Sequence, residues 1–293
     1  MTIPFASTST GHPAAQSTLQ SQFTSFRAEL DASQAQRERI VKISRDITAL
    51  SKQMIFALHR VASGRPWSSV KSEVETKLND LRVLFAKVQA EVRGEDFWRY
   101  ERSISPGLQE YLEGYTFYYY LEHRNLPTLA QCQASLVPPP PPPATGEEIL
   151  IATETSPQEP YVVVTVEDYL GGVADLTGEM MRLAIASVGK NLSSSLSNNP
   201  QDSPEEDNFA DIDKIARVVR EIKGEMDPLA PYARWLNKKL QVLDQSLGKI
   251  ENASYNLKIR GAEYKDADPK LLQQLALKMA SSNDSNRRDE VAV

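Results

Sequence analysis

Four carboxylates in this sequence have the type and spacing of ligands for a divalent metal ion. Glu110 and Glu113 are three residues apart, and Asp175 and Glu179 are four residues apart, so each pair would share one face of a helix. Leu, Val, Met and Tyr surround both pairs, and an acid buried among such residues costs several kcal/mol unless its charge is compensated. A divalent cation would supply that compensation.

The residues alone leave other interpretations of the four acids open. The acids could be solvated surface groups, or partners of Arg182 and Lys190. A ferritin-type di-iron site would need Glu-x-x-His, but Ser9, Phe56 and Tyr120 precede the three histidines at that spacing, so this type of site is excluded. Oxygen ligands favour Mg²⁺, with Mn²⁺ as the alternative, and such ions serve phosphoryl transfer or phosphodiester hydrolysis.

Composition limits the class of protein. The chain has 293 residues, of which 41% are hydrophobic, enough for the core of one large domain. A net charge of −6 argues against a chain that binds nucleic acid tightly without a partner. Cys132 is the only cysteine, so an intramolecular disulfide is excluded. No apolar run approaches the ~20 residues that cross a bilayer and no signal peptide is evident, so we expect a soluble intracellular protein that does not bind membranes.

Apolar residues recur at helical spacing along most of the chain, which predicts an all-α protein. The first helix is expected to begin at Phe23 and to end before Gly64, with one apolar stripe between Ile40 and Val61. Thr165 and Asp168 form a capping-box pattern at the start of a later helix. The other helices are expected near 70–92, 95–122, 165–190, 209–226, 232–257 and 269–280, and 161–164 is the only strand-like segment.

These helices predict a single bundle of about six or seven helices, spanning residues 23–280, with two long surface loops. One loop, at about 133–160, contains six consecutive prolines at 138–143 and cannot be helical. The other is expected at about 193–206. Residues 1–22 are expected to be a disordered tail, and residues 281–293 a polar tail.

Five segments of the sequence resemble the translin-associated protein X (TRAX) branch of the translin family. They are RERIVKISRDIT (37–48), SKQMIFALHR (51–60), GLQEYLE (107–113), DYLGGVADLTGE (168–179) and KIENASYNLKIRG (249–261). The resemblance covers about residues 23–264. It implies a translin-like helical fold and assembly with the paralogue translin into a hollow hetero-oligomer. It also implies Mg²⁺-dependent endoribonuclease activity on single-stranded or nicked RNA, such as passenger-strand or transfer-RNA fragments.

The resemblance also assigns roles to particular residues. The acidic catalytic residues of the family fall on Glu110, Glu113, Asp175 and Glu179, a set that translin itself lacks. On this basis the four acids would hold one or two Mg²⁺ ions that activate a water against the scissile phosphate. Glu110 or Glu179 could alternatively act as the base rather than as a ligand.

Basic residues at helical spacing are candidates for holding the RNA backbone, and ordinary solvated charge is the other interpretation of each. They are Lys42, Arg45, Lys52, Arg99 and Arg102. Trp98 and Tyr100 could stack on unpaired bases or belong to the core.

Two features depart from the family. The basic nuclear-import segment of animal members is missing near the amino terminus, so a cytoplasmic protein is expected and nuclear entry stays open. The proline-rich loop differs from the usual connection.

The competing function is a non-catalytic subunit that partners translin and binds single-stranded DNA or RNA. In that case the four acids would have a structural role.

Overall fold

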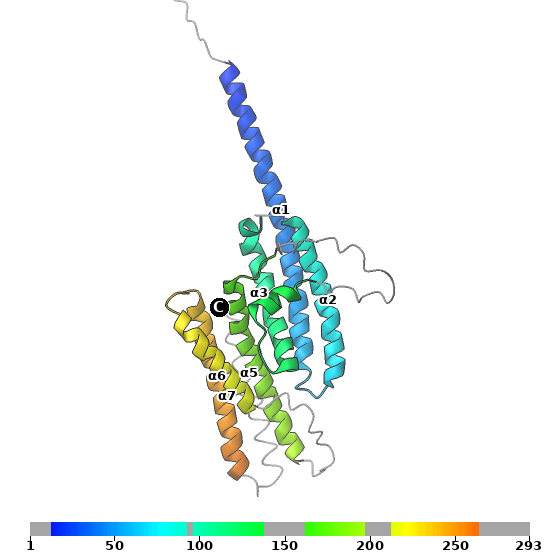
Figure 1. The fold of residues 1–293 in the computed structure, drawn as a ribbon, viewed down its shortest axis with the longest axis vertical. Helices are drawn as coiled ribbons and strands as arrows, with labels where there is room; N and C mark the ends of the chain where they lie inside the picture. Colours follow the sequence, from blue (N-terminus) through cyan, green and yellow to red (C-terminus); the bar gives the residue numbers. More distant parts are fainter. Residues whose placement is uncertain (1–12, 93–95, 138–161, 197–211, 264–293) are drawn as a thin grey trace, which may run out of the picture.

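A computed structural model describes residues 13–92, 96–137, 162–196 and 212–263, which form an elongated bundle of α-helices (Figure 1). No strand occurs within these ranges, so the prediction of an all-α fold is confirmed. The helices are α1 (Pro13–His59), α2 (Trp67–Glu91), α3 (Asp96–His123), α4 (Leu129–Ser135), α5 (Val166–Leu196), α6 (Ile212–Met226) and α7 (Leu236–Glu263), with a 3₁₀ turn η1 (Asp227–Leu229) before α7.

Several boundaries differ from the sequence prediction. Helix α1 begins at Pro13 rather than Phe23, so the expected disordered tail was wrong for residues 13–22, and residues 1–12 lie outside the described ranges. Helix α5 extends to Leu196, past the expected start of the second loop. The strand-like segment is not a strand, although Val162 and Val164 are buried. The proline run, the terminal helix at 269–280 and the polar tail are also outside the described ranges.

Helix α4 was missed by the sequence prediction, which assigned its end to a loop. Its first turn is closed by a capping box in which Thr128 accepts a hydrogen bond from the Gln131 amide and the Gln131 side chain accepts one from the Thr128 amide. This reciprocal cap stabilises a helix of only seven residues. Cys132, on this helix, is buried and its thiol is free.

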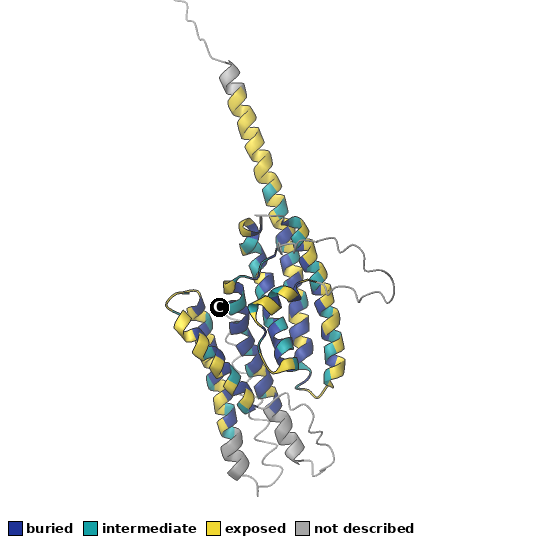
Figure 2. Cartoon of the chain, in the orientation of Figure 1, coloured by how far each residue is buried: buried dark blue, intermediate teal, exposed yellow. Residues whose placement is uncertain are grey.

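Helices α3 and α5 form the centre of the bundle. Helix α1 packs on α2 and α3, α3 packs on α5, and α5 packs on α6 and α7. The predicted stripe of α1 faces this interior: Ile40, Ile47, Met54, Leu58 and Val61 are buried (Figure 2). Burying apolar side chains on helices that are adjacent in space is the main favourable contribution to the fold.

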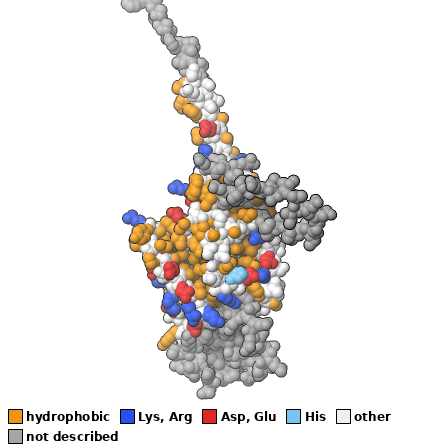
Figure 3. Space-filling model, in the orientation of Figure 1, with side chains coloured by type: hydrophobic (Ala, Val, Ile, Leu, Met, Phe, Trp, Pro, Cys, Tyr) orange, Lys and Arg blue, Asp and Glu red, His pale blue; other side chains and the backbone are white. Residues whose placement is uncertain are grey.

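The amino-terminal part of α1 projects beyond the bundle as an exposed arm (Figures 1 and 2). We define the arm as residues 18–32, all of which are exposed. Leu19, Phe23, Phe26 and Leu30 recur at helical spacing along it and are 55–68% exposed. Figure 3 shows hydrophobic side chains on the surface of the projecting helix. A row of large apolar residues in water is typical of a surface that another chain covers.

Candidate metal and catalytic site

Close contact between helix backbones determines how the candidate acids are placed. A Cβ atom at Gly172 on α5 would lie 2.6 Å from Cβ of Leu112 and 3.2 Å from the backbone nitrogen of Glu113. On the other side of α3, a Cβ atom at Gly107 would lie 2.7 Å from the carbonyl oxygen of Ser44 on α1. Glycine is therefore required at both positions, and it allows α1, α3 and α5 to approach closely around the acids.

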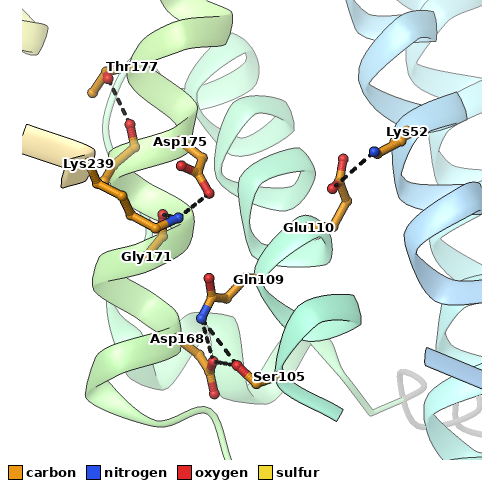
Figure 4. A network of polar contacts seen from close by, with 10 residues as sticks. Lys52, Ser105, Gln109, Glu110, Asp168, Gly171, Asp175, Thr177 and Lys239 are labelled. Atoms are coloured by element: carbon orange, nitrogen blue, oxygen red, sulfur yellow. Dashed lines mark hydrogen bonds and ion pairs between the residues drawn. The ribbon is translucent and has the colours of Figure 1, made fainter. Parts of the chain in front are cut away.

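A buried hydrogen-bond network fixes α5 against α3 next to the acids. Asp168 is only 2% exposed, and its carboxylate accepts hydrogen bonds from Ser105 Oγ (2.5 Å) and Gln109 Nε2 (3.0 Å) (Figure 4). It also accepts one from Thr165 Oγ1 (2.8 Å). Thr165 accepts in turn from the Asp168 amide, as the capping pattern predicts. Because Gln109 precedes Glu110 on α3, the network holds the helix turn that carries the first acid.

Glu113 has the most perturbed environment of the four acids. Burial is the main cause that raises its pKa to about 7, and the nearby charges of Asp175 and Glu110 raise it further. Burial likewise raises the pKa of Glu110, and Asp175 adds to the shift, whereas Lys52 opposes it. The structure thus brings Glu110, Glu113 and Asp175 within electrostatic range of one another; spacing along α3 predicts this for Glu110 and Glu113. Like charges held together in this way would be stabilised by a cation.

Lysines from two other helices approach this group of acids. Nζ of Lys239, on α7, lies 2.5 Å from Asp175 Oδ2 and 3.4 Å from the carbonyl oxygen of Gly171. Nζ of Lys52, on α1, lies 3.8 Å from Glu110 Oε2. Figure 4 shows the two ion pairs, with Asp175 directed toward Lys239 and Glu110 toward Lys52. Each lysine offsets one negative charge of the group.

Glu179 is held separately, one turn further along α5. Its side chain is buried, and His59 Nε2 lies 2.5 Å from Glu179 Oε2 while Arg182 donates to the other carboxylate oxygen. Burial lowers the pKa of His59 to about 4, and the Arg182 charge adds to the shift. The imidazole is therefore neutral at pH 7, and its Nε2 is within hydrogen-bond distance of the Glu179 carboxyl group. Sequence reasoning missed His59, because nothing local links it to a residue 120 positions away.

The four acids are suited to a hard cation, but in this structure their carboxylates do not converge on one point. Four carboxylates supply the oxygen ligands that Mg²⁺ or Mn²⁺ prefers. Within the described ranges, however, no three His, Cys, Asp or Glu side chains are grouped as metal ligands. Binding would require Lys239 and Lys52 to leave Asp175 and Glu110, and these amines are attached to flexible side chains that can turn away.

The candidate RNA-binding residues lie on the surface of the bundle. Lys42, Arg45, Lys52, Arg99 and Arg102 are all exposed. Of these, Lys52 is near an acid of the site. Trp98 is 62% exposed and accessible for stacking, whereas Tyr100 is buried and its hydroxyl donates to Gln36 Oε1 at 3.0 Å. The core interpretation thus holds for Tyr100. None of the described helices is long and apolar enough to cross a membrane.

Comparisons with known proteins agree with the resemblance noted in the sequence. The Translin family model matches residues 35–261. The mouse protein named translin-associated protein X is 38% identical over 249 residues, covering 82% of this chain and 79% of the mouse protein. The Schizosaccharomyces pombe translin-associated protein X homolog is 26% identical over 248 residues, covering 84% of this chain and 90% of the yeast protein.

Solved structures share the fold at low sequence identity. The crystal structure of apo-NeC3PO matches with a TM-score of 0.54 at 16% identity, covering 79% of this chain and 94% of that chain. The structure of AfC3PO matches with a TM-score of 0.53 at 19% identity, covering 82% of this chain and 98% of that chain. At these identities the likeness concerns the helical architecture alone.

Proposed function

Since this chain belongs to the translin family, we propose that it is the catalytic subunit of a hetero-oligomeric endoribonuclease that it forms with a translin-type paralogue. The substrate is single-stranded or nicked RNA and the cofactor is Mg²⁺, with Mn²⁺ as the alternative. The observation that supports this best is the group formed by Glu110, Glu113 and Asp175, in which burial and mutual repulsion raise the pKa of Glu113 to about 7. Such perturbed acids gather at sites that bind ions or move protons.

In this mechanism Glu110, Glu113 and Asp175 would hold the metal ion, and the neighbouring residues would set their charge and position. When bound, Mg²⁺ would supply an activated water and neutralise charge that develops on the phosphate. Glu113 would serve as a ligand in its ionised form, its proton having passed to solvent. Lys239, which pairs with Asp175 in this structure, would be free to contact the phosphate backbone.

Glu179 has a different task in the proposal. His59 and Arg182 hold it in one orientation, so it would act either as a fourth ligand or as the base that receives the proton of the attacking water. The exposed guanidinium of Arg182 remains available for the negatively charged substrate. Asp168 and Gln109 keep α3 and α5 in register beneath these groups.

A second function, a non-catalytic partner of translin that binds single-stranded nucleic acid, is favoured by one observation. Lysines already neutralise Asp175 and Glu110, and Arg182 binds Glu179, so the acids are compatible with a purely structural role. In that case the ion pairs would stabilise the fold and no metal would enter.

Cleavage by the assembled complex distinguishes the two functions. The complex should be purified with its translin-type partner and given labelled single-stranded RNA, with Mg²⁺ or with EDTA. We expect Glu110→Gln, Glu113→Gln, Asp175→Asn and Glu179→Gln each to remove most cleavage while assembly persists, because the amide keeps the shape and loses the charge. Effects should not add, since residues that act as one unit lose nearly everything at the first substitution.

Matched controls are available on the same two helices. Glu101→Gln on α3 and Glu167→Gln on α5 remove acids outside the group and should leave cleavage unchanged. Equal, EDTA-resistant cleavage by wild-type and quadruple-variant complexes would refute the assignment. An inactive wild-type complex that assembles and binds RNA would favour the non-catalytic function.

A further inference from the structure

A surface cavity beside α1 and α2 combines cationic side chains with an exposed aromatic ring. Lys52 and Phe56 are four residues apart and share one face of α1, and Arg60 follows four residues later, directly after the end of that helix. Together with Gln53 and with Lys77 of α2 they line a surface cavity of about 330 Å³. None of these residues except Lys52 belongs to the candidate site described above.

Phe56 is unusual because most of its ring is in water. The residue is 69% exposed, although neighbouring apolar residues of the same helix are buried. The Arg60 guanidinium lies 5.5 Å from the centre of the Phe56 ring. Glu73 fixes that guanidinium by two hydrogen bonds of 2.9 Å. The ring thus stands beside a held cation, with the rest of its surface open.

The charges around the cavity favour an anionic ligand. Glu73 offsets the charge of Arg60, and the 3.8 Å contact with Glu110 offsets part of that of Lys52. Lys77 is half buried and makes no ion pair with another residue of the described ranges. An amine in that position would gain from a phosphate placed at the mouth of the cavity.

We propose that this cavity is a subsite for one unpaired nucleotide of a single-stranded nucleic acid, in which the base stacks on Phe56 and the adjacent phosphates contact Lys77 and Lys52. An unpaired base offers a free π-face of any sequence, and stacking on aromatic side chains beside cations is the usual way in which single strands are held. A base inside a double helix has no free face, so the subsite would select single strands.

Lys52 connects the subsite to the group of acids. It lines the cavity and its Nζ is within 3.8 Å of Glu110, so a strand seated on Phe56 reaches the acids with its next phosphates. This connection rests on the proposed function, whereas binding at Phe56 does not. The two are therefore tested under different conditions, and binding is measured in EDTA, where no metal-dependent cleavage occurs.

The test uses the assembled complex and fluorescence anisotropy of labelled oligouridylate in EDTA. Phe56→Ala should weaken binding by about 5- to 150-fold, the range expected when one stacking contact is lost. Phe56→Tyr should restore it. The same oligonucleotide with abasic positions should bind wild-type and Phe56→Ala complexes equally. Val83→Ala, which removes another exposed apolar side chain on α2, should change nothing.

Lys77→Met tests the phosphate contact independently. For single strands each phosphate contact contributes about 0.7 to the slope of log K against log salt concentration. Lys77→Met should lower the magnitude of the slope by about that amount, and Phe56→Ala should leave it unchanged. Unaltered affinity of the Phe56→Ala complex would overturn the proposal. Loss of assembly on sizing, with normal RNA binding by what remains assembled, would also overturn it and identify Phe56 as a subunit contact.

Discussion

Glu113 is the residue at which burial and charge conflict most strongly. Its neighbours in the sequence are apolar or aromatic, and the nearby charges that act on it include two other acids as well as Arg182 and Lys239. Burial disfavours its ionised form, and Asp175 and Glu110 add repulsion. The carboxyl therefore titrates near neutral pH, where a small change in the surroundings alters its charge.

Replacing Glu113 should stabilise the metal-free protein at alkaline pH. The folded pKa of about 7 lies above the ordinary value of 4.5, so between these values the unfolded chain ionises while the folded chain keeps its proton. Folding free energy is thus lost as pH rises, and the loss is complete above pH 7. Glu113→Gln should recover about 3 kcal/mol at pH 8, and the gain should shrink to about 1 kcal/mol at pH 5 and vanish below pH 4.

Thermal unfolding of the complex in EDTA at pH 5 and pH 8 measures this difference. Glu38→Gln, an exposed acid of α1, serves as the control and should unfold like the wild type at both values. If Mg²⁺ binds the group of acids, adding it at pH 8 should reverse the order of stability, because only the wild type gains from the ion. A Glu113→Gln variant less stable than the wild type at pH 8 in EDTA would contradict the pKa shift.

The His59 contact should be needed to keep Glu179 buried. His59→Phe preserves the ring contact with Phe117 but leaves the carboxylate with Arg182 alone, which should cost about 1–3 kcal/mol of folding free energy. His59→Gln keeps an N–H donor and should restore part of the loss. Chemical denaturation of the complex measures both, with His123→Phe as the exposed control. Equal stability of the His59→Phe and wild-type complexes would show that the contact is dispensable.

The residues that sequence reasoning found and missed differ in how far apart their partners lie. The four acids could be recognised because each pair is local, at three or four residues on one helix. Their counter-charges could not, since Lys239 is 64 positions from Asp175 and His59 is 120 positions from Glu179. Such contacts depend on which helices become neighbours, and periodicity within one helix carries no information about that.

Individual helices were predictable where apolar spacing is regular. Most of the predicted stripe from Ile40 to Val61 is buried as expected, whereas Ile43 and Leu50 are partly buried. The prediction failed for two helical segments that have no regular apolar stripe facing the core. The first turns of α1 contain polar residues after Pro13 that nevertheless form helix, and α4 is too short to show a helical period. The TLAQ cap at 128–131 was the available signal for α4, and the neighbouring prolines obscured it.

The contact between α3 and α5 should tolerate no side chain at Gly172. Gly172→Ala places Cβ 2.6 Å from that of Leu112, so the helices must separate, at a cost of about 1–3 kcal/mol. Gly178 lies on the same helix with nothing within 4 Å of an added Cβ. Gly178→Ala should therefore stabilise by about 0.5–1 kcal/mol, because alanine has the higher helix propensity.

Chemical denaturation of the two variants gives a direct comparison. Both carry the same chemical change on one helix, so only the local space differs between them. Cleavage assays on the same preparations show whether moving α5 also disturbs the acids. If Gly172→Ala proved as stable as Gly178→Ala, the close approach of the two helices would be refuted.

At the scale of the whole molecule, the apolar surface exceeds what one small bundle needs. The arm exposes Leu19, Phe23, Phe26 and Leu30, and α7 and the turn before it expose Tyr232, Val242 and Tyr255. Burying a large apolar side chain is worth about 1.5–3 kcal/mol relative to leaving it in water. These surfaces are therefore suited to contacts between subunits, as the proposed assembly with a translin-type paralogue requires.

Expressed alone, the chain should aggregate or form large irregular assemblies, and co-expression with a translin-type partner should yield a defined complex. Replacing Phe23 and Phe26 with Ser should improve the solubility of the isolated chain and weaken its association with the partner. Sizing with light scattering measures both. Exchange of Ser21 and Ser25, on the same arm, for Ala is the matched control. A monodisperse monomer of the unaltered chain would contradict this expectation.

Helix α1 is continuous from Pro13 to His59 and about 70 Å long. The arm therefore belongs to the same helix as Lys52, which lies next to Glu110, and His59, which contacts Glu179. A subunit bound to Phe23 and Phe26 and a nucleic acid bound near Lys52 would act on the same rigid element. If they favour one position of that helix, each binds more tightly when the other is present, and thermodynamic linkage makes the two gains equal. The affinity for the partner subunit would then report whether nucleic acid is bound near Lys52, at the other end of the helix.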